Sequence, residues 1–271
     1  MGGVSMEIQL WRELLAPYQL AVDEMVIKFQ HVRQEHLIQG LYSPIETVSG
    51  RVKTIESILE KLHRKNISMN QMEEKIEDIA GIRIICQFVE DVDRVRELIR
   101  NRHDMKIRQE KDYLNKKKES GYRSFHLIIE YTVETIHGPK TIPAEIQIRT
   151  MAMNFWATIE HSLQYKYKGG IPEHIQEKLR QASSSVDDID RAMSEVRDEI
   201  LDAQVYHINK DNTVRDILNS IQNLYKVANG REVDKIQEEF YRVYVLDDLV
   251  QLQHFARQLD IISESYRAQS L

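Results

Sequence analysis

Ala144–Thr150 reads Ala-Glu-Ile-Gln-Ile-Arg-Thr, and up to Arg149 its apolar and polar side chains alternate strictly. A period of two predicts an extended strand, with the apolar residues facing the core and the polar residues on the opposite face. The polar face would then carry an acid, an amide and a guanidinium in one row: Glu145, Gln147 and Arg149. An edge strand with a solvated face gives the same pattern, so the neighbouring motifs decide whether this row is a site.

Length and composition narrow the class of protein. A chain of 271 residues with 42% hydrophobic content can form one large domain, or one domain and an appendage. Five prolines, ten glycines and 30% charged residues predict a well-structured and largely helical chain. The net charge of −6 argues against a general nucleic-acid coat protein, so any polyanion would bind a local basic patch.

The expected compartment follows from what the sequence lacks. The single cysteine, Cys86, excludes an internal disulfide and a zinc site built on paired cysteines. No apolar run approaches the ~20 residues of a membrane span, and Met1–Leu10 lacks the basic and apolar regions of a signal peptide. We therefore expect a cytoplasmic protein that does not bind membranes.

Two long helices are predicted within the first 208 residues. Apolar residues recur at alternating steps of four and three in Trp11–Val32 and again in Ile175–Ile200, which is the heptad spacing of packed helices. Pro17 would kink the first helix or mark its start. The two apolar seams have suitable lengths, so we expect them to pack on each other, within a chain or between chains.

Residues 209–271 are predicted to form a helical extension beyond a domain of residues 1–208. The pattern is that of two or more amphipathic helices, separated near Asn229-Gly230. Bare apolar stripes of this size promote association, so something must cover them. The extension either shields its own stripes as a small appendage, which we favour, or docks another protein.

A first basic set surrounds a predicted amphipathic helix at Thr54–Lys65. Four polar residues lie at i, i+4, i+8 and i+11 and so share one face: Lys53, Ser57, Lys61 and Arg64. Exposed lysines are the norm, so a solvated helix face explains this pattern as well. With Arg51 nearby, the sharper alternative is a cradle for phosphate groups.

A second basic set lies in residues 106–118 and leads into Gly121-Tyr122-Arg123-Ser124-Phe125-His126. In an extended chain Tyr122, Ser124 and His126 project together. An aromatic ring, a hydroxyl and an imidazole beside lysines suit a nucleoside with its phosphates. The plainer alternatives are a core or rim aromatic for Tyr122 and a solvated loop for the lysines.

Two carboxylates fall between these basic sets. Asp78 precedes a predicted strand at Ile82–Phe88 that carries Arg83, although an aspartate beside a glycine is often only a turn residue. Glu145 is the acid of the strand quoted first. Converging acids can hold a hard divalent ion between nucleotide phosphates, which favours phosphoryl-type transfer. Phosphate binding would rest on side chains, because neither Gly-x-x-x-x-Gly-Lys-Ser/Thr nor Gly-x-Gly-x-x-Gly occurs.

At these residues the sequence closely resembles the synthetase domain of the RelA/SpoT-homologue family, and specifically its stand-alone small alarmone synthetases. The resemblance spans roughly residues 10–204 in unbroken order, which is far more specific than any short motif. It implies an α/β (α+β) nucleotidyltransferase-like fold: a mixed sheet of about five strands flanked by helices, with long terminal helices and the extra helical tail. The matching segments are Ser43–Glu46, Gly50–Lys53, Asp78–Ile84, Lys118–Ser124, Ala144–Thr150 and Ala152–His161.

The resemblance implies a GTP diphosphokinase. Such an enzyme moves the β,γ-diphosphate of ATP to the 3′-hydroxyl of GDP or GTP, giving ppGpp or pppGpp and AMP. By position, Asp78 and Glu145 match the carboxylates that bind Mg2+ in the family. Glu145 also matches the group that engages the attacking hydroxyl.

The resemblance also implies roles for the two basic sets. The ATP residues would be Arg51 and Arg83, which sandwich adenine, and Lys53, Lys61 and Arg64 on the phosphates. The acceptor residues would be Tyr122 for guanine stacking, Lys111, Lys118 and His126 for phosphates, and Gln147 and Asn154 near the nucleoside. His161, on the same predicted helix as Asn154, receives no role.

The sequence departs from the family at two positions. Lys111 stands where many members have arginine, and Thr47 replaces an aromatic residue. The family implies a homotetramer and leaves a nucleotide or RNA effector open. No hydrolase domain accompanies the synthetase pattern, so we expect synthesis of alarmone without breakdown. Two alternatives remain: the same chemistry on an adenine nucleotide or the 3′ end of tRNA, and an inactive nucleotide- or RNA-binding regulator.

Overall fold

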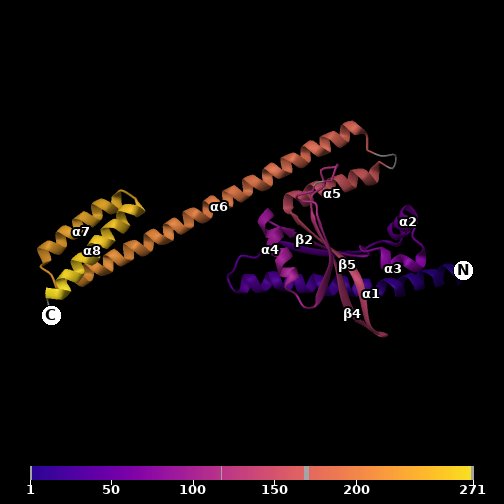
Figure 1. Ribbon diagram of the computed structural model, residues 1–271, viewed down its shortest axis with the longest axis horizontal. Helices are drawn as coiled ribbons and strands as arrows, with labels where there is room; N and C mark the ends of the chain where they lie inside the picture. Colours follow the sequence, from indigo (N-terminus) through magenta and orange to yellow (C-terminus); the bar gives the residue numbers. More distant parts are fainter. Residues whose placement is uncertain (1, 117, 168–170, 270–271) are drawn as a thin grey trace. The chain divides into compact units, whose positions relative to one another are not determined.

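The computed structural model describes residues 2–116, 118–167 and 171–269 (Figure 1). It contains two compact units, Met1–Ser194 and Glu195–Leu271, and the division falls inside one helix, α6. No helix in the described ranges has both the length and the hydropathy of a membrane span. The elements of the first unit are α1 (Gly2–Ile38), β1 (Thr47–Val52), α2 (Ile55–Lys65), η1 (Met69–Gln71), α3 (Met72–Lys75), β2 (Ala80–Cys86), α4 (Val89–Arg100), β3 (Met105–Asp112), β4 (Phe125–Thr135), β5 (Gly138–Thr150), α5 (Met151–Lys166) and the start of α6 (Glu173–Leu224).

A mixed five-stranded sheet forms the centre of the first unit, as predicted, with the strand order β1-β2-β5-β4-β3. β2 and β5 are parallel, and the other neighbouring strands are antiparallel. β5 therefore lies between β2 and β4, and the register sets Glu145 beside Gly81 and Ile128. The predicted alternation in β5 is confirmed, because its apolar residues are fully buried: Ala144, Ile146 and Ile148.

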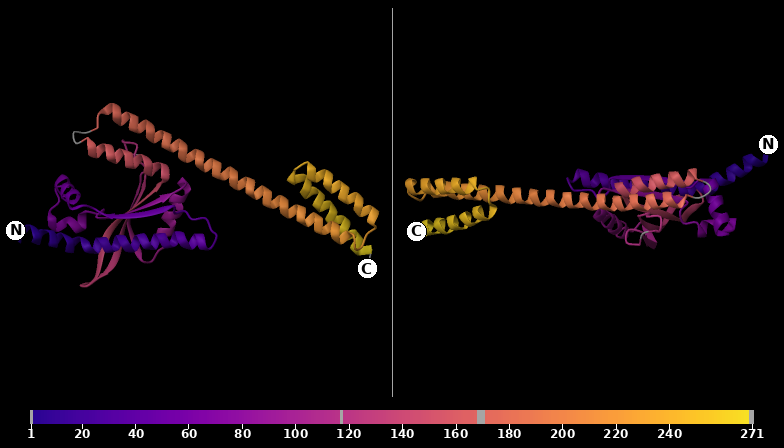
Figure 2. Two further views of the ribbon diagram at one scale, coloured as in Figure 1. Left: turned by 180° about the vertical axis from the view of Figure 1, so that it is seen from behind. Right: turned by 90° about the horizontal axis from the view of Figure 1, so that it is seen from above.

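α1 runs along one face of the sheet (Figures 1 and 2). It contacts β1 and β2, and its apolar seam packs into the core beneath it. Tyr18, Met25 and Phe29 are fully buried in the core that this helix shares with the sheet. The contact is close, since a Cβ added to Gly50 of β1 would lie 2.6 Å from a side-chain carbon of Val22. The predicted seam of this helix is therefore part of the domain core.

The expectation that the two heptad seams pack on each other is wrong. The sheet already covers the seam of α1, so it is not free to meet another helix. In α6, Val186 is buried, whereas Ile189 and Met193 are 52% and 49% exposed. Spacing by fours and threes identifies an apolar stripe but does not say which surface covers it. α1 also continues through Pro17, which is therefore not its start.

α5 and the first part of α6 form a second apolar cluster around Trp156. The Trp156 indole N–H donates to the carbonyl of Leu179 at 2.9 Å, which fixes α6 against α5. Tyr122, from the loop before β4, packs on the edge of this cluster. The start of α6 is thus built into the first unit.

One predicted strand shifts in the structure, because β2 spans Ala80–Cys86, two residues before the predicted Ile82–Phe88 at each end. The extended chain that would project Tyr122, Ser124 and His126 together is not one continuous strand, because β4 begins at Phe125 and Tyr122 lies in the loop before it. Ser124 is fully buried, and its hydroxyl donates to the carbonyl of Ile148 at 3.2 Å.

The second unit consists of the rest of α6 with α7 (Gly230–Val245) and α8 (Leu249–Gln269), which lie beside it (Figure 2). Asn229 begins α7, where its side chain accepts from the N–H of Arg231 at 3.1 Å. α6 runs unbroken to Leu224, so no helix begins near residue 209. The apolar stripes cover one another, as predicted, in one core: Ile217, Ile221, Leu224, Val233, Phe240, Leu252, Phe255 and Leu259.

Candidate active site

Asp78 lies just before β2, between two lysines of the first basic set. Lys53 Nζ and Lys61 Nζ donate to its two carboxylate oxygens at 2.8 and 2.7 Å. Thr54 caps α2 by accepting from the N–H of Ser57, which places Lys53 just outside the helix and Lys61 within it. Burial disfavours the charged carboxylate, but the two lysines outweigh burial and hold the pKa of Asp78 below its ordinary value.

Glu145 is the second carboxylate, and β4 and β5 supply its partners. Its Oε1 lies 2.9 Å from His126 Nδ1, and its Oε2 accepts from Gln147 Nε2 at 2.8 Å. Burial raises the pKa of Glu145, and so does the charge of Asp78, but the contacts with His126 and Gln147 bring it below its ordinary value. Glu145 is therefore ionised at neutral pH, as is Asp78.

Tyr122 is joined to the sheet through His126 and Arg149. Its hydroxyl lies 2.8 Å from His126 Nε2 and accepts from Arg149 Nη2. Lys118 Nζ lies 4.7 Å from the centre of the Tyr122 ring, within the range of a cation–π contact. A single imidazole thus connects the Tyr122 hydroxyl to the carboxylate of Glu145.

One cavity of about 580 Å3 collects most of the predicted residues. A smaller recess of about 120 Å3 adjoins it on the side of β1 and β2. Both carboxylates line both spaces, so each is open to a ligand in either one. The predicted residues in the lining of the larger cavity are Arg51, Asp78, Arg83, Lys118, Tyr122, His126, Glu145 and Gln147.

Arg51 and Arg83 form the β1–β2 side of the cavity. Gly81 stands beside Arg51 in the register, and its missing side chain leaves the recess open. Burial lowers the pKa of Arg83, and the positive charges of Arg149 and Arg51 lower it further. Arg83 Nε is buried and has no hydrogen-bond partner among the described residues, so it is a donor that a ligand can satisfy.

Five predicted residues lie outside the described lining of this cavity: Lys53, Lys61, Arg64, Lys111 and Asn154. The first two reach it through Asp78. Arg64 is exposed on α2, and Lys111 Nζ donates to Glu77 at 3.1 Å. Asn154 lies on α5, where its Oδ1 is buried and meets no hydrogen-bond partner in the part of the chain that the structure describes. Lys117 of the second basic set lies outside the described residues.

Three ionisable residues in the described lining of this cavity received no role from the sequence: Arg149, Glu160 and His161. Arg149 belongs to the polar row of β5, so the alternation was the signal for it. Glu160 and His161 lie three and four residues after Ala157, which also lines the cavity. Residues at this spacing share one face of a helix, so the spacing was the sequence signal for these two residues. Burial raises the pKa of Glu160, although the charges of His161, Lys118 and Arg149 oppose this.

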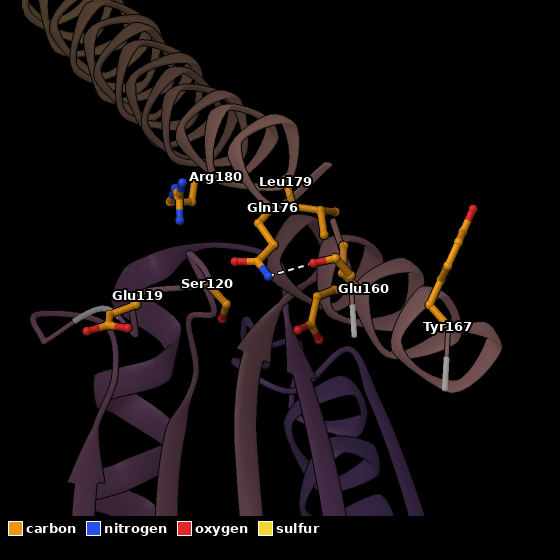
Figure 3. Close-up of a pocket in the computed structure, with 8 residues that line it drawn as sticks. Glu119, Ser120, Glu160, Tyr167, Gln176, Leu179 and Arg180 are labelled. Atoms are coloured by element: carbon orange, nitrogen blue, oxygen red, sulfur yellow. Dashed lines mark hydrogen bonds between the residues drawn. The ribbon is translucent and has the colours of Figure 1, made fainter. Parts of the chain in front are cut away.

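A second cavity of about 470 Å3 adjoins the first, because Ser120 and Glu160 line both. Its walls come from the loop before β4, from α5 and from the start of α6. Figure 3 shows Glu119 and Ser120 of the loop on one side and Arg180 of α6 on the other. The loop that carries Tyr122 therefore runs between the larger cavity and α6.

Comparison with known proteins places this chain in a family. The pattern described as a region found in RelA / SpoT proteins matches residues 50–170. The chain is 47% identical over 199 residues to GTP pyrophosphokinase YjbM of Bacillus subtilis (strain 168), covering 73% of this chain and 94% of that protein. It is 40% identical over 193 residues to GTP pyrophosphokinase YwaC of the same organism, covering 70% and 91%.

Solved structures agree with these relatives. The B. subtilis small alarmone synthetase 1 bound to its product pppGpp superposes with a TM-score of 0.69 at 47% identity, covering 71% of this chain and 98% of that one. A GTP pyrophosphokinase family protein from Streptococcus pneumoniae gives a TM-score of 0.68 at 52% identity, covering 72% and 96%. The chain therefore belongs to the RelA/SpoT family, in its group of small alarmone synthetases.

Proposed function

We propose that this chain is a (p)ppGpp synthetase, which transfers the β,γ-diphosphate of ATP to the 3′-hydroxyl of GDP or GTP. The observation that carries the proposal is the order of the strands around Glu145. β1 and β2 bring Arg51 and Arg83 to one side of β5, and β4 with its preceding loop brings His126 and Tyr122 to the other. Two purine-binding groups on opposite sides of a carboxylate suit a donor and an acceptor nucleotide. The pppGpp bound by the B. subtilis relative supports this assignment.

The donor nucleotide would occupy the β1–β2 side. Arg51 and Arg83 present planar guanidinium groups, which stack on aromatic faces such as adenine. The phosphates would then extend toward Asp78, where Lys53 and Lys61 already lie. Ammonium groups bind phosphate as point charges, and Arg64 adds a further positive charge to the same helix.

The acceptor nucleotide would occupy the β4 side. Stacking on the Tyr122 ring would hold the guanine, since base–aromatic stacking contributes roughly 1–3 kcal/mol per base. Lys118 and His126 would contact its phosphates, and Gln147 the ribose. We keep Lys111 and Asn154 as proposed acceptor contacts.

The reaction balances without any group beyond the two nucleotides and this chain's side chains. The 3′-oxygen of the acceptor attacks the β-phosphorus of ATP, the bond from that phosphorus to the oxygen shared with the α-phosphate breaks, and AMP leaves. The proton of the hydroxyl passes to Glu145, whose lowered pKa keeps it ionised and able to accept. His126, 2.9 Å away, holds the carboxylate in place.

Asp78 and Glu145 would hold Mg2+. Their oxygens are hard ligands, and proteins commonly bind Mg2+ through one or two carboxylates together with substrate phosphates. No group of three or more His, Cys, Asp or Glu side chains in the described ranges could hold a metal by itself. When bound, Mg2+ would neutralise charge on the transferred diphosphate.

Incubation with ATP and each of GDP, GTP, ADP and tRNA, followed by chromatography of the products, tests the proposal. We expect ppGpp or pppGpp and AMP in equal amounts, and no product when EDTA removes Mg2+. Product formed only with ADP or tRNA would show that the acceptor is not a guanine nucleotide. No product with any of the four acceptors would refute the proposal that the chain is an enzyme.

Assembly and compartment complete the proposal. We propose a homotetramer in the cytoplasm, regulated by a nucleotide or RNA effector, with contacts made outside the buried seam of α1. The half-exposed Ile189 and Met193 of α6 are candidates for such a contact. Light scattering tests the assembly directly, and a monomeric mass at micromolar concentration would refute it.

A further inference from the structure

The loop that carries Tyr122 rests directly on α6. In this loop, residues 118–123 and called here the acceptor loop, the N–H of Gly121 donates to the carbonyl of Lys118 at 2.9 Å and closes a tight turn. Gly121 has a φ of +89°, a conformation that favours glycine. Tyr122 follows immediately, so this turn sets the direction in which its ring leaves the backbone.

Ser183 of α6 holds the turn by its backbone. Its hydroxyl donates to the carbonyl of Gly121 at 2.5 Å, and the residue is only 4% exposed. A Cβ added to Gly121 would lie 2.7 Å from Ser183 Cβ, a distance too short for two carbons. The turn and the helix are therefore in direct contact, with no space for a side chain between them.

Asp187, one helical turn further along α6, holds the other end of the loop. It pairs with Arg123, the residue after Tyr122, and the two side chains are only 15% and 13% exposed. Arg123 also lies 3.8 Å from Asp190 of the same helix. Removing one partner of such a pair leaves the other charge largely buried and uncompensated, which costs more than breaking an exposed ion pair.

We propose that Ser183 and Asp187 are positioning residues for the acceptor nucleotide: they fix the acceptor loop so that Tyr122 presents its ring to the purine. The inference rests on the proposed function, because it takes Tyr122 as the stacking residue. The two contacts bracket Tyr122 on both sides in the chain. Without them, the nucleotide would have to order the loop as it binds, at the expense of affinity.

The effect should be selective for the acceptor. The donor groups Arg51 and Arg83 belong to β1 and β2, on the far side of β5 from the acceptor loop. A change at α6 should therefore raise the KM for GDP and leave the KM for ATP unchanged. A general loss of stability would not separate the two substrates.

Steady-state kinetics of the full chain tests this, with GDP varied at saturating ATP and then the reverse. We expect the KM for GDP to rise ~2- to 10-fold in Ser183→Ala and ~10-fold in Asp187→Asn, with kcat and the KM for ATP close to wild type. Asp188→Asn is the matched control, because its pair with Arg191 is exposed, at 71% and 68%. Asp187→Glu, which keeps the negative charge facing Arg123, should retain more of the GDP affinity than Asp187→Asn.

Equal rises in both KM values, or no rise in either, would overturn the inference. A failure of the proposed function looks different, since the wild type itself would then transfer no diphosphate to GDP. Thermal melts of each variant show whether it folds. If Asp187→Asn does not fold, the KM values of Ser183→Ala test the inference. Equilibrium dialysis of GDP alone gives the same comparison for a variant with too little turnover.

Discussion

Glu145→Gln tests the proposed chemistry most directly, because it keeps the shape of the side chain and removes its charge. The carboxylate now makes two hydrogen bonds, at 2.9 Å to His126 and 2.8 Å to Gln147. A glutamine has one acceptor oxygen and can keep only one of them unchanged. A hydrogen bond to a charged group contributes roughly 1.5–3 kcal/mol, so the free energy of unfolding should fall by no more than that.

Turnover of the same variant should fall much further. The amide cannot take up the proton of the hydroxyl and places no negative charge beside the reacting phosphorus. We expect a loss of ~100-fold or more, which is ~2.7 kcal/mol or more of transition-state stabilisation. Single-turnover formation of AMP at saturating nucleotides measures this, and equilibrium dialysis checks that both nucleotides still bind.

Glu130→Gln is the control for that experiment. It makes the same change on β4, where Glu130 pairs with Lys106 at 3.7 Å, and should keep wild-type turnover. Near-normal turnover in Glu145→Gln, with binding intact, would refute the role given to this carboxylate.

Three further predictions concern the acceptor site, the pH dependence of stability and the second unit. Tyr122→Ala should raise the KM for the guanine nucleotide, by ~1–3 kcal/mol in binding, more than the KM for ATP; equal effects on both would contradict stacking. Burial raises the pKa of Asp190 to about 6, against the hydrogen bond from Thr150 and the charge of Arg123, so the folded state keeps a proton that the unfolded state loses. The stability due to this proton is present below about pH 4 and is lost as pH rises through 6. In denaturant titrations, the free energy of unfolding of Asp190→Asn should therefore rise by up to ~3 kcal/mol relative to that of wild type between pH 4 and 7. A difference that stays constant with pH would contradict the shift. Deleting residues 209–271 should leave diphosphate transfer largely intact, because every residue in the described lining of the larger cavity precedes residue 162. Assembly should change, and a product assay with light scattering measures both effects. A truncated chain that folds and assembles but has no activity would contradict this.

The strands and the carboxylates were predictable because their signals are local. The alternation in Ala144–Arg149 depends only on the two faces of a strand, and the structure reproduces it. The same rule placed Arg149 on the polar row, but its contact with the Tyr122 hydroxyl depends on a loop from another part of the chain. Spacing along one element cannot supply that contact.

Contacts between residues far apart in the chain could not be predicted from the sequence. The periodicity of α1 was correctly recognised, yet its partner is the sheet and not a second helix. The spacing of Lys53 and Lys61 predicts a shared face, either solvated or a phosphate cradle, and only the fold brings the two lysines onto Asp78. One signal was overlooked: Glu173–Leu224 contains neither glycine nor proline, which favours the single helix observed.

The sheet order has a consequence for how such enzymes can diverge. In the proposed site, the donor groups stand on β1 and β2 and the acceptor groups on β4 and its loop, and β5 is the strand between the two halves. Mutations that accumulate in one half therefore leave the backbone of the other half in place, provided that β5 is unchanged. A lineage can exchange its acceptor while inheriting the ATP half intact, and substitutions that alter acceptor choice should gather on the β4 side of Glu145.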